Sequence, residues 1–142
     1  MKYQIVTNLT HLRLKSELVM PEEVASIVHD LNDSLDLKLG CGLTAVQIGI
    51  YKQVSIIKFR KIDIVLINPV ILEKIERYRF LGESCLSLPG LKMDTARYSE
   101  ITILNNGERT LQFDGMEAAI VQHEIDHMQG VTILDRKWRR RG

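Results

Sequence analysis

The sequence has 142 residues, of which 45% are hydrophobic and 26% are charged. This length and composition predict one globular domain over 1–142 and exclude a disordered or fibrous chain. The net charge of +1 excludes a surface-wide attraction to DNA or to anionic membranes. No apolar run is long enough to cross a bilayer, and the N-terminal residues lack the apolar stretch of a signal peptide. Two cysteines are too few for a disulfide framework, so we expect a cytoplasmic protein.

Apolar spacing predicts a helix near the start of the chain. Between 21 and 37, apolar side chains recur at the three- and four-residue intervals of one helical face. Pro21 is typical of a first helical position, and the acidic residues that follow it suit the positive end of the helix dipole. Gly40 and Gly42 predict a tight turn after this helix.

The middle of the sequence predicts a set of strands. Segments 53–59 and 62–67 are rich in Val and Ile and predict two neighbouring strands. Segment 71–80 predicts a further strand. A loop over 82–90, punctuated by glycine and proline, is expected to follow this strand and to carry Cys85.

The last third predicts a hairpin and a second helix. Alternating apolar residues on either side of Asn106-Gly107 predict two antiparallel strands joined by a tight turn. A helix is expected over 115–128, with Gly130 as its stop. Five basic side chains lie in the last seven residues, and a solvated basic end is the preferred interpretation over a contact with RNA phosphates.

The second helix carries the pattern HExxH. His123 and His127 lie four residues apart, so both imidazoles project from one helical face and can bind one metal ion. Glu124 can reach a water molecule activated by that metal without being a ligand. A tetrahedral ion needs a third protein ligand, and downstream only Asp135 offers an oxygen. Cys85 is the upstream candidate, a thiolate that leaves one position open for catalysis.

Three segments together resemble the signature motifs of the peptide deformylase family. The segments are GCGLTAVQIG at 40–49, ESCLS at 83–87 and QHEIDHMQG at 122–130. They match, in order and spacing, the family patterns GxGLAAxQ, EGCLS and HExDH. This combination is far more specific than HExxH alone. The resemblance implies an α+β fold in which antiparallel sheets surround a central metal-binding helix.

The resemblance implies an enzyme that removes the formyl group from the N-terminal formylmethionine of nascent polypeptides and releases formate. By matching motif positions, the metal ligands are Cys85, His123 and His127. Glu124 takes the role of the acid/base that moves a proton from water to the leaving amine. The Gln47 side-chain amide and the Leu86 backbone N–H are expected to stabilise the charge that develops on the formyl oxygen.

Other residues are expected to contact the peptide. An extended substrate is expected to lie along exposed backbone near Gly42, Leu43 and Ser84, where glycine permits a close approach. An apolar pocket for the methionine side chain is expected to contain Met116, Ala119 and Ile120. Core packing explains these last three residues equally well.

Two positions depart from the family patterns. Thr44 replaces an alanine, and its hydroxyl is expected to bond a nearby carbonyl at small cost. Ser84 replaces a glycine, and we expect backbone strain there because the family pattern suggests a dihedral that mainly glycine can adopt. Glu83 and Arg97 are expected to form a structural ion pair beside the site rather than to act in catalysis.

The chain ends 15 residues after His127, whereas many bacterial members of the family continue into a C-terminal helix. We therefore expect a minimal form, similar to phage-encoded or organelle-derived members. Its expected partners are formyl-Met nascent peptides, with a weak ribosome contact through the basic C-terminus as a further hypothesis. The resemblance implies Fe²⁺ as the natural ion, and Zn²⁺, Ni²⁺ or Co²⁺ suit the same donors.

Two other functions stay open from the sequence. A zinc-type metallopeptidase shares the HExxH pattern, but its usual downstream ligand is missing. A non-catalytic binding module on a deformylase scaffold is suggested by Ser84 and by the short length. The presence of Glu124, Gln47 and all three metal ligands argues against this loss of chemistry.

Overall fold

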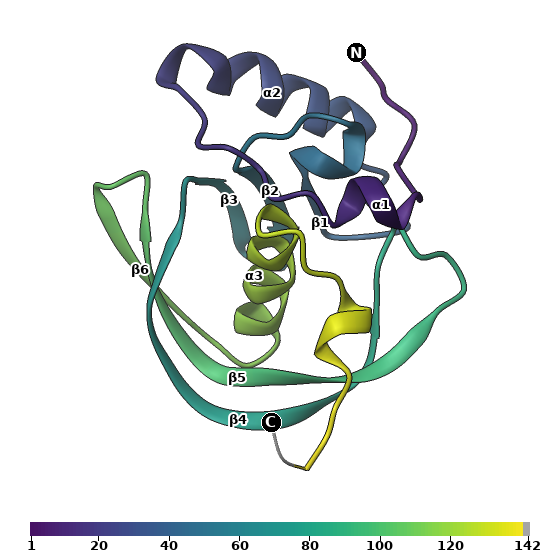
Figure 1. The fold of residues 1–142 in the computed structure, drawn as a ribbon. Coiled ribbons are helices and arrows are strands. Elements are labelled where there is room, and N and C mark those ends of the chain that lie inside the picture. Colours follow the sequence, from purple (N-terminus) through teal and green to yellow (C-terminus); the bar gives the residue numbers. More distant parts are fainter. Residues whose placement is uncertain (141–142) are drawn as a thin grey trace.

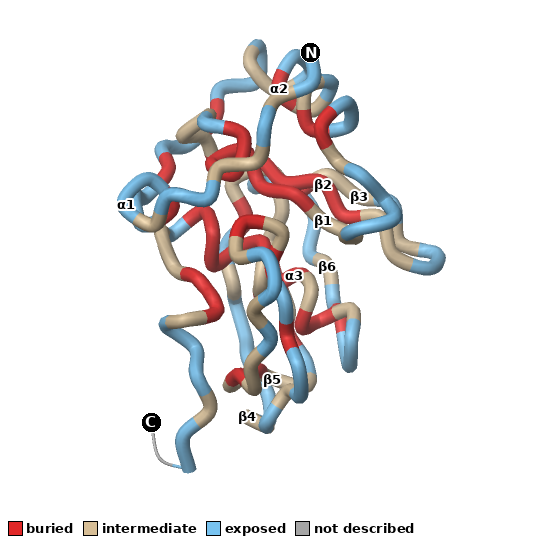
Figure 2. Tube along the Cα trace, turned by 90° about the vertical axis from the view of Figure 1, so that its right-hand side faces the viewer, coloured by how far each residue is buried: buried red, intermediate tan, exposed pale blue. Residues whose placement is uncertain are grey.

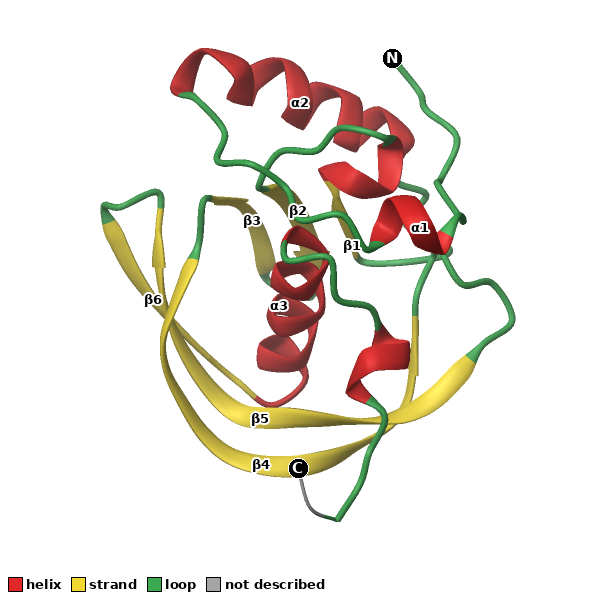
Figure 3. Cartoon of the chain, in the orientation of Figure 1, coloured by secondary structure: helices red, strands yellow, loops and turns green. Residues whose placement is uncertain are grey.

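The computed structural model describes residues 1–140 and has an α+β fold (Figures 1 and 3). Its helices are α1 (Leu9–Leu12), α2 (Pro21–Ser34) and α3 (Gly115–Met128), with the short 3-10 helices η1 (Ala45–Ile48) and η2 (Ile133–Arg136). Its strands are β1 (Gly42–Thr44), β2 (Val54–Phe59), β3 (Ile62–Ile67), β4 (Val70–Ser84), β5 (Lys92–Asn105) and β6 (Arg109–Asp114). Within residues 1–140, no helix combines the length and the apolar character that crossing a membrane requires.

The strands form two antiparallel sheets, ordered β1-β2-β3 and β4-β5-β6. Figure 1 shows α3 in the middle of the molecule, with the long, curved β4 and β5 on one side and the first sheet on the other. Helix α2 packs on the outer face of the first sheet and contacts β2. The expected arrangement of sheets around a central helix is confirmed.

Two hydrophobic clusters stabilise this arrangement. Successive residues of a strand point to opposite faces of its sheet. In β2, Ile57 therefore joins the cluster around α3, whereas Ile56 joins the cluster under α2. Figure 2 shows that buried segments concentrate in the first sheet and in α3, while α2 exposes its outer face. Because α3 is covered from several sides, its polar site residues are held in a mostly dry environment.

The first predicted helix is three residues shorter than expected. It ends at Ser34, since Leu35 adopts an extended conformation with φ −80° and ψ 118°. The Ser34 hydroxyl donates to the carbonyl of Asp30 and accepts from the backbone N–H of Tyr3, which ties the helix end to the N-terminal segment. Leu35 still packs against the cluster under α2, which explains why the apolar spacing in the sequence continues past the end of the helix.

The predicted glycine turn was also misplaced. The chain turns earlier, where the backbone N–H groups of Leu39 and Gly40 both donate to the carbonyl of Asp36. Gly42 begins β1 and, like Gly40, has no positive φ. The hairpin prediction is confirmed, because Asn106 and Gly107 have φ values of 56° and 66°, as the turn between β5 and β6 requires.

Strand β4 extends further than predicted and includes part of the expected loop. Gly82, with φ 66°, lies at a register shift between Phe80 and Glu83, and pairing with β5 then resumes. Gly82 thus forms a bulge rather than the start of a loop. Cys85 directly follows the last residue of the strand, so its position is fixed by the sheet.

The N-terminal half of β5 extends beyond the end of β6. Two groups outside the sheet bond to the backbone of β5 there. The Gln122 side chain on α3 accepts from the backbone N–H of Tyr98 and donates to the backbone carbonyl of the same residue, both at 2.9 Å. Further along, Thr95 forms an isolated antiparallel bridge with Lys137. Helix α3 and the C-terminal segment are therefore both anchored to the backbone of β5.

We expect the cluster around α3 to dominate stability. Ile103 is fully buried there, whereas Ile75 on β4 is 41% exposed. Ile103→Ala should lower the free energy of unfolding by about 2–5 kcal/mol, because it removes buried methyl groups and leaves a cavity. Ile75→Ala, the matched control, should cost clearly less in the same urea titration. Equal losses for the two variants would contradict this account of the core.

Candidate metal centre

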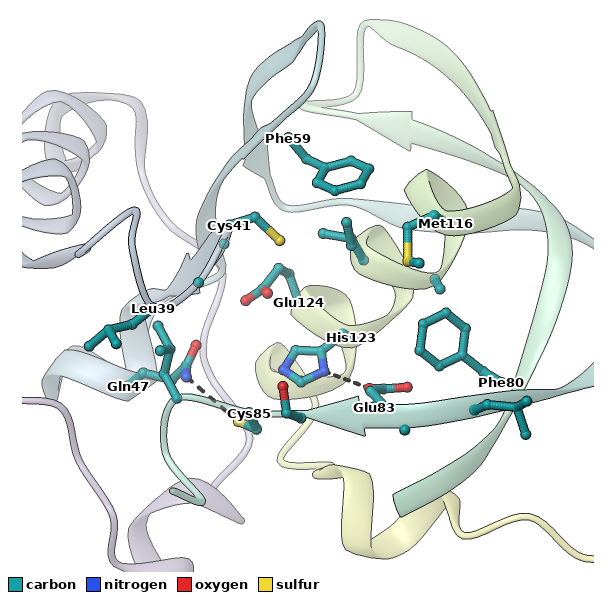
Figure 4. A pocket seen from close by; sticks show the side chains of 18 residues that line it. Leu39, Cys41, Gln47, Phe59, Phe80, Glu83, Cys85, Met116, His123 and Glu124 are labelled. Carbon is teal, nitrogen blue, oxygen red and sulfur yellow. Dashed lines mark hydrogen bonds and ion pairs between the residues drawn. The ribbon is translucent and has the colours of Figure 1, made fainter. Parts of the chain in front are cut away.

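Helix α3 and the end of β4 bring three metal-binding side chains together. His123 and His127 lie one turn apart on α3, with ring centroids 4.9 Å apart. Cys85 approaches from β4, and its Sγ lies 3.3 Å from Nε2 of His127. Figure 4 shows Cys85 and His123 facing the same space from these two elements. The structure therefore assembles the sequence-predicted ligand set.

The donor atoms fit a single metal ion. One donor atom of each residue, the thiol or an imidazole nitrogen, lies within 4.8 Å of the other two. Ligands of a tetrahedral ion with bond lengths of about 2.0–2.3 Å are separated by roughly 3.3–3.8 Å, so only small side-chain shifts are needed. A thiolate with two imidazoles suits a borderline or soft divalent cation.

The electrostatics of this cluster favour a positive charge. Burial lowers the pKa of His123, but its hydrogen bonds with Cys85 and Glu83 outweigh that effect and raise the pKa well above the usual value. Burial and the neighbouring His123 charge lower the pKa of His127 well below its usual value. The surroundings of His123 thus favour positive charge at this place, and a bound cation would serve the same electrostatic purpose.

A buried ion network orients the first histidine. Glu83 accepts a 2.6 Å hydrogen bond from Nδ1 of His123, which leaves Nε2 of the ring to face Cys85. Arg97, only 2% exposed, donates through Nε to Glu83 at 2.8 Å and through Nη1 to Asp126 at 2.7 Å. Burial raises the pKa of Glu83, but the bonds from His123 and Arg97 outweigh burial and lower it strongly. The predicted structural pair of Glu83 and Arg97 is confirmed.

The sequence interpretation missed the other members of this network. Asp126 bonds both Arg97 and Arg136, and Thr95 donates to Glu83 at 2.6 Å. Asp126 lies inside the HExDH segment, one residue before His127, and that position was the only available signal for it. Thr95 comes from β5, and nothing local in the sequence indicates its partner.

Glu124 lies beside the ligands and is 4% exposed. Its Oε1 accepts a 2.9 Å hydrogen bond from the Thr44 hydroxyl. Burial raises the pKa of Glu124, while the charge of His123 and the Thr44 hydroxyl act in the opposite direction. A Cβ atom at Gly42 would lie 2.7 Å from Oε2 of Glu124. A side chain at position 42 would therefore displace this buried carboxylate, so the close approach of Glu124, and not a turn, accounts for the glycine.

Gln47 has a fixed amide orientation. Its Oε1 accepts from the backbone N–H of Thr44 at 2.9 Å, so Nε2 points the other way and donates to the Ser87 hydroxyl at 3.1 Å. The second hydrogen of Nε2 has only a loose contact, 3.9 Å, with Sγ of Cys85. Gln47 is 1% exposed and lines the cavity at the site, as does Leu86. An amide donor is thus available to an oxygen placed beside Cys85.

A cavity of about 310 Å³ adjoins these residues. Five of the six predicted substrate-binding residues line it: Gly42, Ser84, Met116, Ala119 and Ile120. The sixth, Leu43, is fully buried in the cluster under α2. Four aromatic or aliphatic residues that sequence reasoning missed also line the cavity, as Figure 4 shows in part: Leu39, Phe59, Phe80 and Leu81.

The expected strain at Ser84 is absent. The described non-glycine residues with positive φ are Arg60, Asn68, Glu76 and Asn106. Ser84 instead continues β4 and pairs with Lys92, and the bulge two residues earlier places the glycine at position 82. A serine therefore fits position 84 without a left-handed backbone. Cys41 and Cys85 are both free thiols.

Comparison with known proteins agrees with this geometry. A family model described as polypeptide deformylase matches residues 3–141. The peptide deformylase of Aquifex aeolicus is 36% identical over 135 residues, which cover 87% of this chain and 79% of the relative. The chain belongs to the peptide deformylase family.

Two further relatives indicate how the chain compares in extent. Peptide deformylase 2 of Prochlorococcus marinus is 36% identical over 124 residues, and the match covers 81% of this chain but only 62% of that relative, less than two thirds. The crystal structure of peptide deformylase from Thermotoga maritima is 27% identical, with a TM-score of 0.86, and the match covers 98% of this chain and 99% of the other. The family fold is therefore present along almost the whole chain.

We expect the buried ion network to be essential for stability. Arg97→Ala should lower the free energy of unfolding by about 3–5 kcal/mol, because it leaves Glu83 and Asp126 as buried carboxylates without their shared cation. The control is Arg79→Ala, which breaks a pair with Asp94 in which the arginine is 56% exposed, and should cost less than about 1 kcal/mol. Urea titration of both variants checks the contrast, and similar losses would disprove the assigned role of Arg97.

Proposed function

We propose that this chain is a metal-dependent hydrolase that removes the formyl group from N-terminal formyl-Met peptides and releases formate. The main support is a single observation. A Cys-His-His donor set lies at the end of a mostly apolar cavity, with a buried carboxylate beside it. We further propose that 1–142 act as one catalytic unit.

Cys85, His123 and His127 would hold the metal. When bound, a divalent cation there supplies Lewis acidity that activates a water molecule and polarises the formyl carbonyl. We propose Fe²⁺ as the natural ion, with Zn²⁺, Ni²⁺ or Co²⁺ as substitutes, because the donor set suits all four. Glu83 would keep the His123 ring in the orientation that ligation requires, through its 2.6 Å bond to Nδ1.

Glu124 carries the proton. Its carboxylate lines the cavity and is raised in pKa by burial, which suits a group that must accept a proton and then release it. In the first step it takes a proton from the attacking water. In the second step it delivers that proton to the amine nitrogen as the bond between formyl carbon and nitrogen breaks.

Two neutral donors would stabilise the tetrahedral intermediate. The formyl oxygen gains negative charge as water adds, and fixed N–H groups aimed at it lower the barrier. Gln47 offers the loosely bonded hydrogen of Nε2 beside Cys85, and its amide is held by Thr44 and Ser87. The Leu86 backbone N–H is the second proposed donor, since the residue directly follows Cys85 and lines the cavity.

The substrate peptide would pair with the first sheet as an additional strand. Among the described residues, β2 is the only strand that pairs with β1, so the other edge of β1 before Thr44 would accept an extended chain, while the Thr44 backbone N–H binds Gln47. This mode uses backbone groups around Gly42 and Leu43, which explains how Leu43 contributes even though its side chain is buried. The methionine side chain would enter the cavity wall formed by Met116, Ala119 and Ile120.

We also propose that the protein acts in the cytoplasm, where its two free thiols stay reduced. A weak ribosome contact through the basic C-terminus is a further proposal. Arg136 is paired with Asp126, and Arg77 stacks on Trp138. The basic residues that follow Trp138 include Arg141, which lies outside the described residues.

Formate release tests the proposed chemistry. Metal-loaded protein should release formate from a formyl-Met peptide and leave an acetyl-Met peptide and an internal peptide bond intact. Glu124→Gln should keep the metal but lower kcat by at least about 10³-fold, because the proton carrier is lost. Cys85→Ser should instead reduce the metal content. Hydrolysis of internal bonds would favour a metallopeptidase, and a metal-loaded wild type without any turnover would favour a binding module.

Cosedimentation tests the ribosome proposal. Deletion of Arg139 to Arg141 should lower the fraction of protein that sediments with ribosomes, and added salt should weaken binding of the intact chain, because phosphate contacts release counterions. The deletion begins beyond Lys137 and so retains its bridge to Thr95. Thermal unfolding of the truncated protein serves as a control for folding. Unchanged cosedimentation would disprove the contact.

A further inference from the structure

A buried hydroxyl contacts the carboxylate that we assign to proton transfer. The Thr44 Oγ1 lies 2.9 Å from Oε1 of Glu124 and 3.1 Å from the backbone carbonyl oxygen of the same residue. Thr44 is fully buried and Glu124 is 4% exposed. Thr44 is not among the residues that line the cavity, so its hydroxyl can act on the reaction only through Glu124, while its backbone N–H separately binds Gln47.

A second hydroxyl supports the first. Ser55 faces Thr44 across the β1–β2 pair, and the two hydroxyl oxygens are 2.6 Å apart. When Glu124 is ionised, its Oε1 and its backbone carbonyl oxygen can only accept, so the arrangement that satisfies both contacts has Thr44 donating to Glu124. Ser55 then donates to Thr44. The result is a directed chain of hydrogen bonds from Ser55 through Thr44 to Glu124, in which each bond polarises the next.

The two carboxylate oxygens of Glu124 have different surroundings. Oε1 is bonded to Thr44, whereas Oε2 lies against Gly42, which lines the cavity. A methyl group at position 42 would collide with Oε2. The bond from Thr44 and the missing side chain at Gly42 together fix the rotation of the carboxylate and leave one oxygen accessible from the cavity.

We propose that Thr44 is a positioning residue for Glu124 in the deformylation reaction, an inference that rests on the function proposed above. A proton leaves the attacking water, binds Oε2 of Glu124 and later moves to the amine nitrogen. Thr44 keeps its own proton throughout. When Glu124 becomes neutral, the Thr44 hydroxyl can turn to the backbone carbonyl at 3.1 Å, so it has an acceptor in both states.

The hydroxyl at this position is a feature of the present chain. The family pattern to which GCGLTAVQ corresponds has alanine in place of Thr44. An alanine cannot bond the carboxylate, and Ser55 would then also lack this partner.

The test compares metal-loaded wild type with Thr44→Val, which removes the hydroxyl at nearly constant volume, and Thr44→Ser, which retains it. Thr44→Val should lower kcat about 10- to 100-fold, as expected for a lost hydrogen bond to a charged group. KM for the formyl-Met peptide and the ratio of metal to protein should stay within about twofold, because Thr44 contacts neither. Thr44→Ser should restore most of kcat.

Thr132→Val is the matched control. Thr132 is a buried threonine outside the site, and its hydroxyl accepts from the backbone N–H of Leu134 at the start of η2. The control should lower the thermal unfolding temperature without changing kcat. Ser55→Ala provides a second variant should Thr44→Val fail to fold, and it should lower kcat about two- to fivefold because the supporting donor is lost.

Several outcomes would overturn the inference. A folded Thr44→Val with wild-type kcat, or a Thr44→Ser as slow as Thr44→Val, would show that the hydroxyl plays no part. Loss of metal from Thr44→Val would assign Thr44 a structural role only, and wild-type kcat in Ser55→Ala would exclude the supporting chain. Failure of the proposed function is distinguishable, since the wild type itself would then release no formate.

Discussion

The structure depends on the buried guanidinium of Arg97. This one cation joins β4 to α3, because it binds Glu83 at the end of the strand and Asp126 within the helix. Glu83 is two residues from Cys85 and bonds His123, whereas Asp126 is next to His127. The two elements that supply the metal donors are thus held by the same ion network. Apolar residues in place of the whole network would stabilise the fold about as well, but removal of one partner leaves a buried charge unpaired, so the network specifies one arrangement of the charged groups.

Burial sets the chemistry of the site as much as the identity of its residues does. Glu83, Glu124 and Asp126 are all at least nine-tenths buried and lie in or next to α3. Arg97 is paired directly with Glu83 and Asp126, whereas Glu124 has a hydrogen bond from the neutral Thr44 hydroxyl and feels the charges of His123 and Arg97 without pairing with either. Carboxylates in such a setting are costly unless positive charge is close. A divalent cation between Cys85 and the two histidines would meet this need.

The motif residues could be predicted from the sequence because their spacing encodes chemistry. HExxH on a helix predicts convergent imidazoles, and Asn106-Gly107 predicts the hairpin, since both are local properties. Strand partners and ion networks are not local. Thr95 and Ser55 meet the site through the sheet register, Asp126 joins it through the distant Arg97, and the bulge at Gly82 shifted the expected loop into β4. Resemblance to a family placed Gln47 beside Cys85, which composition and periodicity do not reveal.

The contacts that cover the free edge of β5 have a consequence for the solubility of the protein. Beyond the end of β6, the N-terminal half of β5 would present unpaired backbone groups, and exposed edges of this kind recruit other chains into intermolecular sheets. The Gln122 amide occupies the edge at Tyr98, and Lys137 pairs at Thr95. The segment after α3 thus works as a shield against self-association. Gln122 directly precedes His123 on α3. Its amide therefore covers the edge of β5 against pairing with another chain and also fixes how the metal-binding helix sits on the sheet.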